Sequence, residues 1–261
     1  MKKLFIIAII SILALATMSF TGGNGVTLRL RPIKGKTYVI FSKTNQTTTM
    51  KVQNQTMRNS QNMDIRQSFT AKEVSASQNV FETQVDAIKM VSTTMGMTFT
   101  YDSDNPQNTS PMIADQASEF DKIIKKNSTV TYTDLGHNAD PENLEMSQLN
   151  NVIIELPEKE LHVGDKWDYV KTQSVSNYNV SINMTYTITK ISKKSVDVSF
   201  SGTIDSKDIT GTYDGTSTID LQTGIVMEST VNNNLSMTIS EQGLEIPVTV
   251  KGTSTVSVSE R

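Results

Sequence analysis

Cysteine is absent from the 261 residues, and this absence excludes several kinds of chemistry at once. Without a thiolate the chain has no nucleophilic cysteine, no thiolate zinc site and no iron–sulfur cluster. It also has no disulfide, which an oxidising compartment would permit but does not require. A lipid anchor attached to an N-terminal cysteine is excluded for the same reason.

Histidine is scarce, since His137 and His162 are the only two. Neither has a second histidine or a Glu-x-x-His pattern nearby, so the usual motif of a zinc hydrolase is missing and both fit polar turns. A spatial Ser–His–Asp triad could still use either histidine, but no Gly-x-Ser-x-Gly segment presents a nucleophile. The glycines are scattered singly, so no phosphate loop or dinucleotide turn is present. We therefore assign no catalytic, cofactor-binding or metal-binding residue.

Asp102 and Asp104, in the segment 101–108 (YDSDNPQN), resemble the opening of a calcium loop. The pattern then fails, because Pro106 replaces the third ligand and Ile113 stands where a bidentate glutamate belongs. Asp, Ser, Asn and Pro together favour a turn after a strand that ends at Tyr101.

Charge of one sign is not concentrated anywhere, and the net charge is only −3. Because no basic stripe exists, nucleic-acid binding has no electrostatic support. Aromatic residues make up 6% of the chain. A membrane-spanning barrel would need aromatic girdles at the ends of its strands, so we do not expect one.

The first 22 residues have the pattern of a secretory signal peptide. Lys2 and Lys3 precede an apolar run from Leu4 to about Leu15, and small residues follow at Ala14, Ala16 and Ser19. We expect cleavage, a periplasmic or extracellular destination, and a single β-rich domain over residues 23–261. The alternative is an uncleaved anchor in the inner membrane, since about 17 uncharged residues can just span a bilayer.

Apolar residues alternate with Ser, Thr or Asn along much of the remaining chain, most regularly over residues 180–188. A period of two is typical of a strand with one buried and one solvated face. Similar patterns predict strands at 38–40, 50–52, 63–65, 81–85, 95–101, 196–200, 235–239, 244–250 and 256–258. Turn-like segments at 192–195 and 240–245 indicate hairpins. Pro247 suggests an edge position or a bulge.

Two segments have the pattern of amphipathic helices. In 111–126, Ser110 is expected to cap the helix, and one face carries the apolar residues Ile113, Ala117, Phe120, Ile123 and Ile124. In 141–150, Asp140 is the expected cap and Pro141 suits the first turn. We therefore predict a mainly β fold: an antiparallel, strongly curved sheet or half-open barrel with one or two short helices that cover part of it.

The two halves of the chain, 23–150 and 151–261, contain similar segments. LRPIKGKTY at 30–38 is similar to LHVGDKWDY at 161–169, and TVTYTDLGHNAD at 129–140 is similar to TSTIDLQTGIVME at 216–228. This spacing is too long for a solenoid and suggests a duplicated β unit.

Trp167, the only tryptophan, follows the turn-forming Val163, Gly164 and Asp165. We interpret it as a structural residue at the start of a strand, with its indole N–H bound to a partner. LPEKELHVGDKW, with the earlier GKTY and the later DLQTGIV, resembles an uncharacterised family of secreted Gram-negative bacterial proteins with an L-P-x(n)-V-G-D-x-W segment. The resemblance implies an exported β protein and no particular activity.

Three classes of function stay open. The first is a periplasmic binding or carrier module for an apolar ligand or peptide, the second a cell-envelope module that binds a protein or glycan, and the third, least favoured, a hydrolase. Two short helices leave part of a curved apolar face uncovered. Thirteen methionines, densest at 90–97, suit varied ligands or a core. We therefore expect a partly open apolar groove for a lipid-like or peptide ligand.

Overall fold

The protein is built on one antiparallel sheet of eleven strands, seen in a computed structural model that describes residues 25–52, 55–139, 152–175, 178–206, 209–241 and 244–261. The strands of the N-terminal part are β1 (Thr37–Val52), β2 (Gln55–Val74), β3 (Gln78–Thr94), β4 (Met97–Asp102) and β5 (Asn127–Thr133). Those of the C-terminal part are β6 (Lys166–Val175), β7 (Tyr178–Ile191), β8 (Ser195–Asp205), β9 (Ile209–Asp220), β10 (Val226–Glu241) and β11 (Leu244–Glu260).

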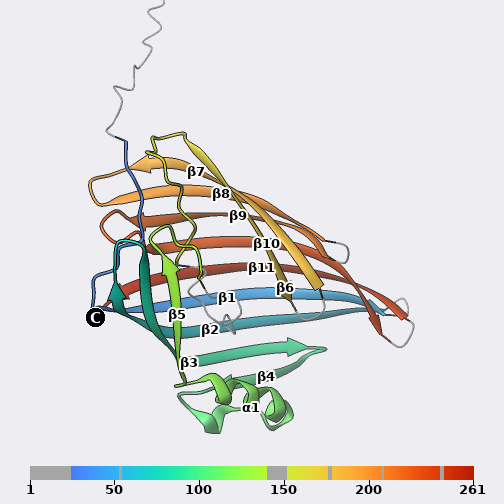
Figure 1. Cartoon of the computed structure of the whole chain (residues 1–261). Helices are drawn as coiled ribbons and strands as arrows, with labels where there is room; N and C mark the ends of the chain where they lie inside the picture. Colours follow the sequence, from blue (N-terminus) through green and yellow to red (C-terminus); the bar gives the residue numbers. More distant parts are fainter. Residues whose placement is uncertain (1–24, 53–54, 140–151, 176–177, 207–208, 242–243) are drawn as a thin grey trace, which may run out of the picture.

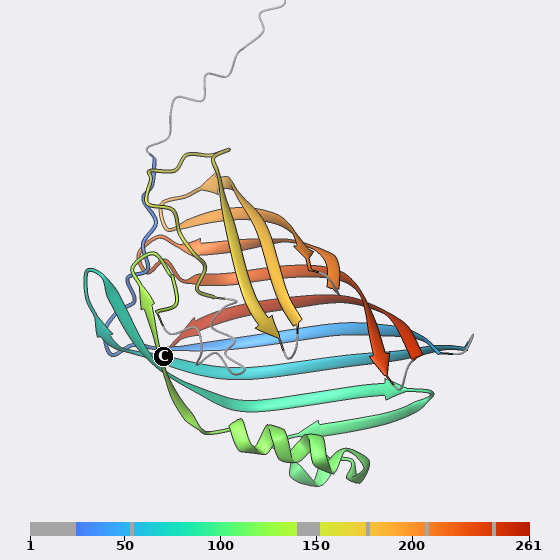
Figure 2. The same ribbon diagram turned by 45° about the vertical axis from the view of Figure 1, so that its right-hand side comes forward.

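Two meanders make up this sheet, and the pairing of β1 with β11 joins them. The strand order is β4-β3-β2-β1-β11-β10-β9-β8-β7-β6. At the β3 edge, β4 pairs with the second half of β3 and β5 pairs with its first half. The other edge is β6, and the sheet does not close on itself. Figures 1 and 2 show it strongly curved, as the sequence predicted.

Alternation of side chains gives the sheet two unlike faces. We define the inner face as the one that carries Tyr38, Phe69 and Val256, all of which are buried. Residues directly opposite one another on antiparallel strands share a face, so the register assigns every other strand residue to it. Residues 51–52 and 55–62, which are mostly polar, form the end of β1 and the start of β2.

The hydrophobic core lies at one end of the inner face, which we call the packed end. It is the end with the β2–β3, β7–β8 and β9–β10 turns. The fully buried aromatic and large aliphatic side chains of this core include Leu28, Leu30, Tyr38, Ile40, Phe69, Phe81, Tyr132, Leu161 and Ile188. Tyr38 stacks on Phe69 with ring centroids 5.0 Å apart, and Phe69 meets Phe81 edge-on at 5.5 Å.

Two irregular segments, 25–31 and 152–161, tie strands together at the packed end. The N–H of Leu30 donates to the carbonyl of Asp134, just after β5, and the N–H of Arg31 donates to that of Thr223, between β9 and β10. Val26 and Leu161 exchange two backbone hydrogen bonds of 2.9 and 2.8 Å, which link the two segments. These two segments therefore cross the packed end of the sheet and connect strands that are not neighbours in it.

Trp167 is buried at the second residue of β6, 8% exposed. Its indole ring stacks on Tyr186 at 5.0 Å, and its Nε1–H donates to the carbonyl of Glu155 at 3.0 Å. Gly164, with φ +93°, makes the turn before the strand, and its N–H donates to Ile188. The structural interpretation of this segment is confirmed.

The helix at 111–126 is shorter than predicted. A 3₁₀ turn, η2 (Pro111–Ile113), leads into α1 (Ala114–Ile123), and another 3₁₀ turn, η1 (Pro106–Asn108), precedes them. Ser110 does not cap the helix, because its hydroxyl accepts a hydrogen bond from the N–H of Thr100 in β4. The predicted apolar face is confirmed, since Ala117 and Phe120 pack with Ile65, Ile88, Met90 and Tyr101 of the sheet.

Of the remaining sequence predictions, the edge position of Pro247 agrees with the structure and the others are not tested by it. Pro247 lies one residue beyond the last β1–β11 pair, Met50 with Val248, so β11 is locally an edge there, as expected. The predicted helix at 141–150 and the signal segment 1–22 lie outside the described residues. Gly35 and Gly164, in the two similar segments, both have positive φ ahead of a strand, and the duplicated unit stays a prediction.

Candidate functional site

The inner face of the five strands β2, β1, β11, β10 and β9 is uncharged between the core and the distal ends, as far as its side chains are described. Among the side chains that the structure describes there, the register places no Asp, Glu, Lys or Arg between the core and the distal ends of the strands. Charged residues such as Lys43, Asp64 and Asp214 are on the outer face. Since desolvating a charge is costly, an uncharged face is the one that an apolar ligand can cover.

An apolar row crosses the distal half of this face over five neighbouring strands, β2, β1, β11, β10 and β9. The residues that stand directly opposite one another in this row are Met57, Met50, Val248, Met237 and Ile209. Val248 is buried and the other four are half-buried. We define the distal patch as this row with its inner-face neighbours Leu235, Ile239, Leu244, Ile246 and Val250.

The distal patch remains in contact with solvent at its rim, where Ile239 is 37% and Leu244 is 47% exposed. Helix α1 covers the inner face only near β2, β3 and β4, and the large core cluster lies toward the packed end. Singly exposed apolar residues are ordinary on protein surfaces. Contiguous apolar faces, unlike single apolar residues, are a common feature of binding surfaces.

Methionine is concentrated on this face. Met50, Met57 and Met237 belong to the distal row, and Met63 and Met184 are half-buried inner-face residues nearer the core. The flexible thioether side chain adapts to ligands of different shape. The sequence left the methionines of 90–97 open between a ligand surface and the core. Met90 is a core residue beneath α1, whereas Met95 and Met97 are 70% and 50% exposed.

Glu155 joins the two edges of the sheet near the packed end. Its carboxylate lies 2.8 Å from Nδ1 of His137, in the loop after β5, and it also hydrogen bonds to the Tyr169 side chain of β6. A cavity of about 60 Å³ lies beside Glu155, Tyr169 and Tyr186. Burial, and next the charge of Glu155, raises the pKa of Tyr186 to about 12. This tyrosine therefore stays protonated and cannot serve as a base at neutral pH.

The remaining residues considered in the sequence form no catalytic or metal centre. The N–H of His162 donates to the carboxylate of Asp165 in the turn before β6, far along the chain from His137. Asp102 accepts hydrogen bonds from the N–H groups of Asp104 and Asn105, which confirms the turn. Within the part of the chain that the structure describes, no three His, Asp or Glu side chains are arranged to hold a metal ion.

Sequence reasoning identified the alternating strands but missed the distal patch. The signal was present, because Met50, Met57, Met237 and Val248 all alternate with polar residues. The periodicity shows that each strand has an apolar side, but it does not show which strands stand beside one another.

In a comparison with protein families, a family of unknown function, DUF6263, matches residues 130–226. This stretch runs from β5 through β6–β9 and includes Trp167. It supports a relation to an uncharacterised family. The sequence matches no curated protein.

Comparison with solved structures gives matches over most of this chain, among them a lipovitellin and an outer membrane channel. A structure of lipovitellin, described for its lipid–protein interactions, is 8% identical and has a TM-score of 0.51, with 87% of this chain and 25% of the lipovitellin chain covered. The present chain thus spans a quarter of that protein, and the likeness concerns the fold alone. An outer membrane channel from Pseudomonas putida F1 is 9% identical over 88% of this chain and 97% of the channel, with a TM-score of 0.35. In the described part of the present chain, no helix is long and apolar enough to cross a membrane.

Proposed function

We propose that this protein is an exported, non-enzymatic binding or carrier module whose lipid-like ligand lies on the inner face, across the distal patch. The observation that carries the proposal is the apolar row that crosses five strands, on a part of the inner face where the described side chains are uncharged. An acyl chain matches such a row, because it needs a long apolar surface and no specific hydrogen-bond partner.

The strength of binding follows from the area that the ligand removes from water. Each methylene group buried contributes about 0.8 kcal/mol. An acyl chain that buries about eight of them gains about 6 kcal/mol, and immobilising the chain offsets part of this gain. The dissociation constant is therefore expected to be in the range of tens of micromolar to millimolar, where it is measurable by titration.

The likeness to lipovitellin supports this proposal only through the shape of the sheet. That protein is described for lipid–protein interactions, and its fold resembles the present sheet over most of this chain. The likeness supports a sheet of this shape as a suitable surface for lipid. The ligand class proposed for this chain depends on its own inner face.

Titration of an environment-sensitive fatty-acid probe against the pure protein tests the proposal. The decisive variant is Met237→Lys, which places a charge within the distal row, and the matched control is Ser236→Lys, whose side chain is exposed on the outer face of β10. We expect saturable binding to the wild type and to Ser236→Lys, with at least a tenfold loss in Met237→Lys. Lipid extracted from the native host should displace the probe.

Absence of saturable binding to the wild type, or equal binding by the two lysine variants, would contradict the proposal. The inner face would then be a surface for another protein or a glycan of the cell envelope. Circular dichroism of both variants checks that the added charge has not unfolded the sheet.

A further inference from the structure

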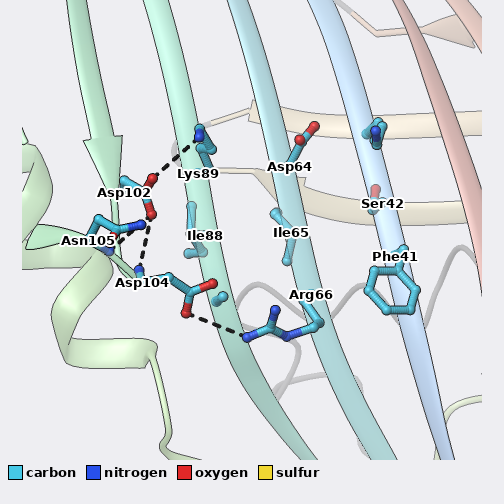
Figure 3. Close-up of a pocket in the computed structure, with 12 residues that line it drawn as sticks. Phe41, Ser42, Asp64, Ile65, Arg66, Ile88, Lys89, Asp102, Asp104 and Asn105 are labelled. Atoms are coloured by element: carbon cyan, nitrogen blue, oxygen red, sulfur yellow. Dashed lines mark hydrogen bonds and ion pairs between the residues drawn. The ribbon is translucent and has the colours of Figure 1, made fainter. Parts of the chain in front are cut away.

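A second, separate pocket of about 300 Å³ lies on the outer face, over β1, β2 and β3 (Figure 3). Its floor is the backbone of Ser42, Ile65 and Ile88, which stand side by side on the three strands. Figure 3 shows Arg66 and Phe41 along one side of this floor and Lys89 and Asp64 along the other. This volume is at the lower end of the range of small-molecule sites, which begins at about 300 Å³.

The hollow has a local cause in the sequence. Ala87 stands opposite Arg66 on the outer face and ends that cross-strand row at β3, so its small side chain leaves space next to the turn at 102–105. The register between β2 and β3 shifts directly after this pair, which bends β3 there. The turn at 102–105 forms the end wall, because the N–H of Ser103 donates to the carbonyl of Ile88.

The charges around the pocket are only partly paired. Lys89 lies 3.3 Å from the buried carboxylate of Asp102, and Arg66 lies 3.5 Å from Asp104. Lys43 and Asp64 stand opposite each other on β1 and β2, yet neither takes part in an ion pair with any described residue. One cation and one anion are thus available at the same side of the pocket.

An exposed aromatic ring completes the set. Phe41 is 43% exposed on the outer face, beside Arg66 in the same cross-strand row. Its ring offers apolar surface, and an aromatic face also attracts an ammonium group. The pocket therefore combines the apolar ring of Phe41 with one cation and one anion that form no ion pair with a described residue.

We propose that this outer pocket binds a small zwitterion with an apolar side group, of the size of an amino acid. Asp64 receives the ammonium group, Lys43 receives the carboxylate, and Phe41 contacts the apolar group. A ligand with both charges satisfies both residues, whereas a simple anion or cation leaves one of them unmatched. This proposal is independent of the inner face, since the two sites lie on opposite sides of the sheet.

Three small probes with one phenyl ring separate the contributions: L-phenylalanine, phenethylamine without the carboxylate, and 3-phenylpropanoate without the ammonium group. Chemical-shift changes in the full chain, measured by two-dimensional NMR, report binding at each strand. We expect L-phenylalanine to saturate the outer pocket and to bind at least fivefold more tightly than either singly charged probe.

Variants then identify the residues. Asp64→Asn and Lys43→Gln should each weaken L-phenylalanine binding by about tenfold, whereas Lys51→Gln, an exposed control on the same face of β1, should leave it unchanged. All three side chains are exposed, so the fold is retained. Equal affinity for the three probes, no saturation, or equal binding by Asp64→Asn and the wild type would overturn the proposal.

Discussion

Replacing Trp167 by alanine is the most direct test of how the packed end is held together. The ring is 8% exposed, stacks on Tyr186 and belongs to the large core cluster. Its indole N–H also binds the carbonyl of Glu155 and so attaches the 152–161 segment to β6. The substitution therefore removes apolar packing, an aromatic pair and a hydrogen bond from one place.

The magnitude follows from these three contributions. A Trp→Ala change in a core costs about 3–5 kcal/mol, which includes the lost stacking and the remaining cavity. For a domain of this size, each kcal/mol lowers Tm by about 2–4 °C, so we expect a decrease of about 6–20 °C. Because Trp167 is the only tryptophan, unfolding must be followed by circular dichroism rather than by tryptophan fluorescence.

His162→Ala is the matched control. The side chain of His162 is 52% exposed, and its nearest ionic contact, Asp165, is 3.6 Å away, so the expected change is below about 0.5 kcal/mol. An unchanged Tm in Trp167→Ala, combined with loss of lipid-probe binding, would show that the ring serves a ligand and not the core.

Three further predictions concern other parts of the chain. The intact mass of protein exported by its native host should show a mature start between about Thr17 and Gly23; a full-length chain in the inner membrane would mean an anchor. Gly136→Ala should cost about 1–3 kcal/mol more in urea unfolding than Gly35→Ala, because both have φ near +80° but only at Gly136 would a Cβ lie 2.2 Å from a carbonyl oxygen, that of Ile154. Burial alone would raise the pKa of Asp102, but Lys89 and the N–H groups of Asn105 and Asp104 lower it overall. The ionised carboxylate therefore stabilises the fold above about pH 4, and this stabilisation is lost as pH falls through the lowered pKa. Asp102→Asn should lack that acid-dependent decrease in the free energy of unfolding; a parallel decrease in both proteins would contradict it.

Local patterns were enough to predict the class of fold. Alternation over 180–188 corresponds to β7, and the apolar spacing of Ala117 and Phe120 corresponds to the buried side of α1. These features depend on neighbours within a few residues, which a sequence displays directly. The cap at Ser110 was predicted wrongly because a residue in β4 competes for its hydroxyl, and that contact depends on tertiary structure.

The two edges and the packed end could not be predicted in the same way. Glu155 contacts His137 on one side and β6 on the other, and the N–H of Leu30 donates to the carbonyl of Asp134, a residue far along the chain. Such contacts depend on where irregular segments cross the sheet, and irregular segments have no periodicity. The sequence indicated two halves that meet near residue 150, but not that the segment 152–161 would connect both edges.

The distal patch depends on one long-range pairing more than on any single residue. Met57 and Met50 belong to the first meander, whereas Val248 and Met237 belong to the last two strands, and the two pairs meet only because β1 pairs with β11. A register shift of one residue in that pairing would place Lys51 or Thr249 beside the apolar row and would interrupt it. The buried residues nearer the packed end, among them Ile40 and Val256, oppose such a shift, since it would turn one set of them toward solvent. The core at the packed end therefore fixes the register that makes the apolar face continuous at the distal end.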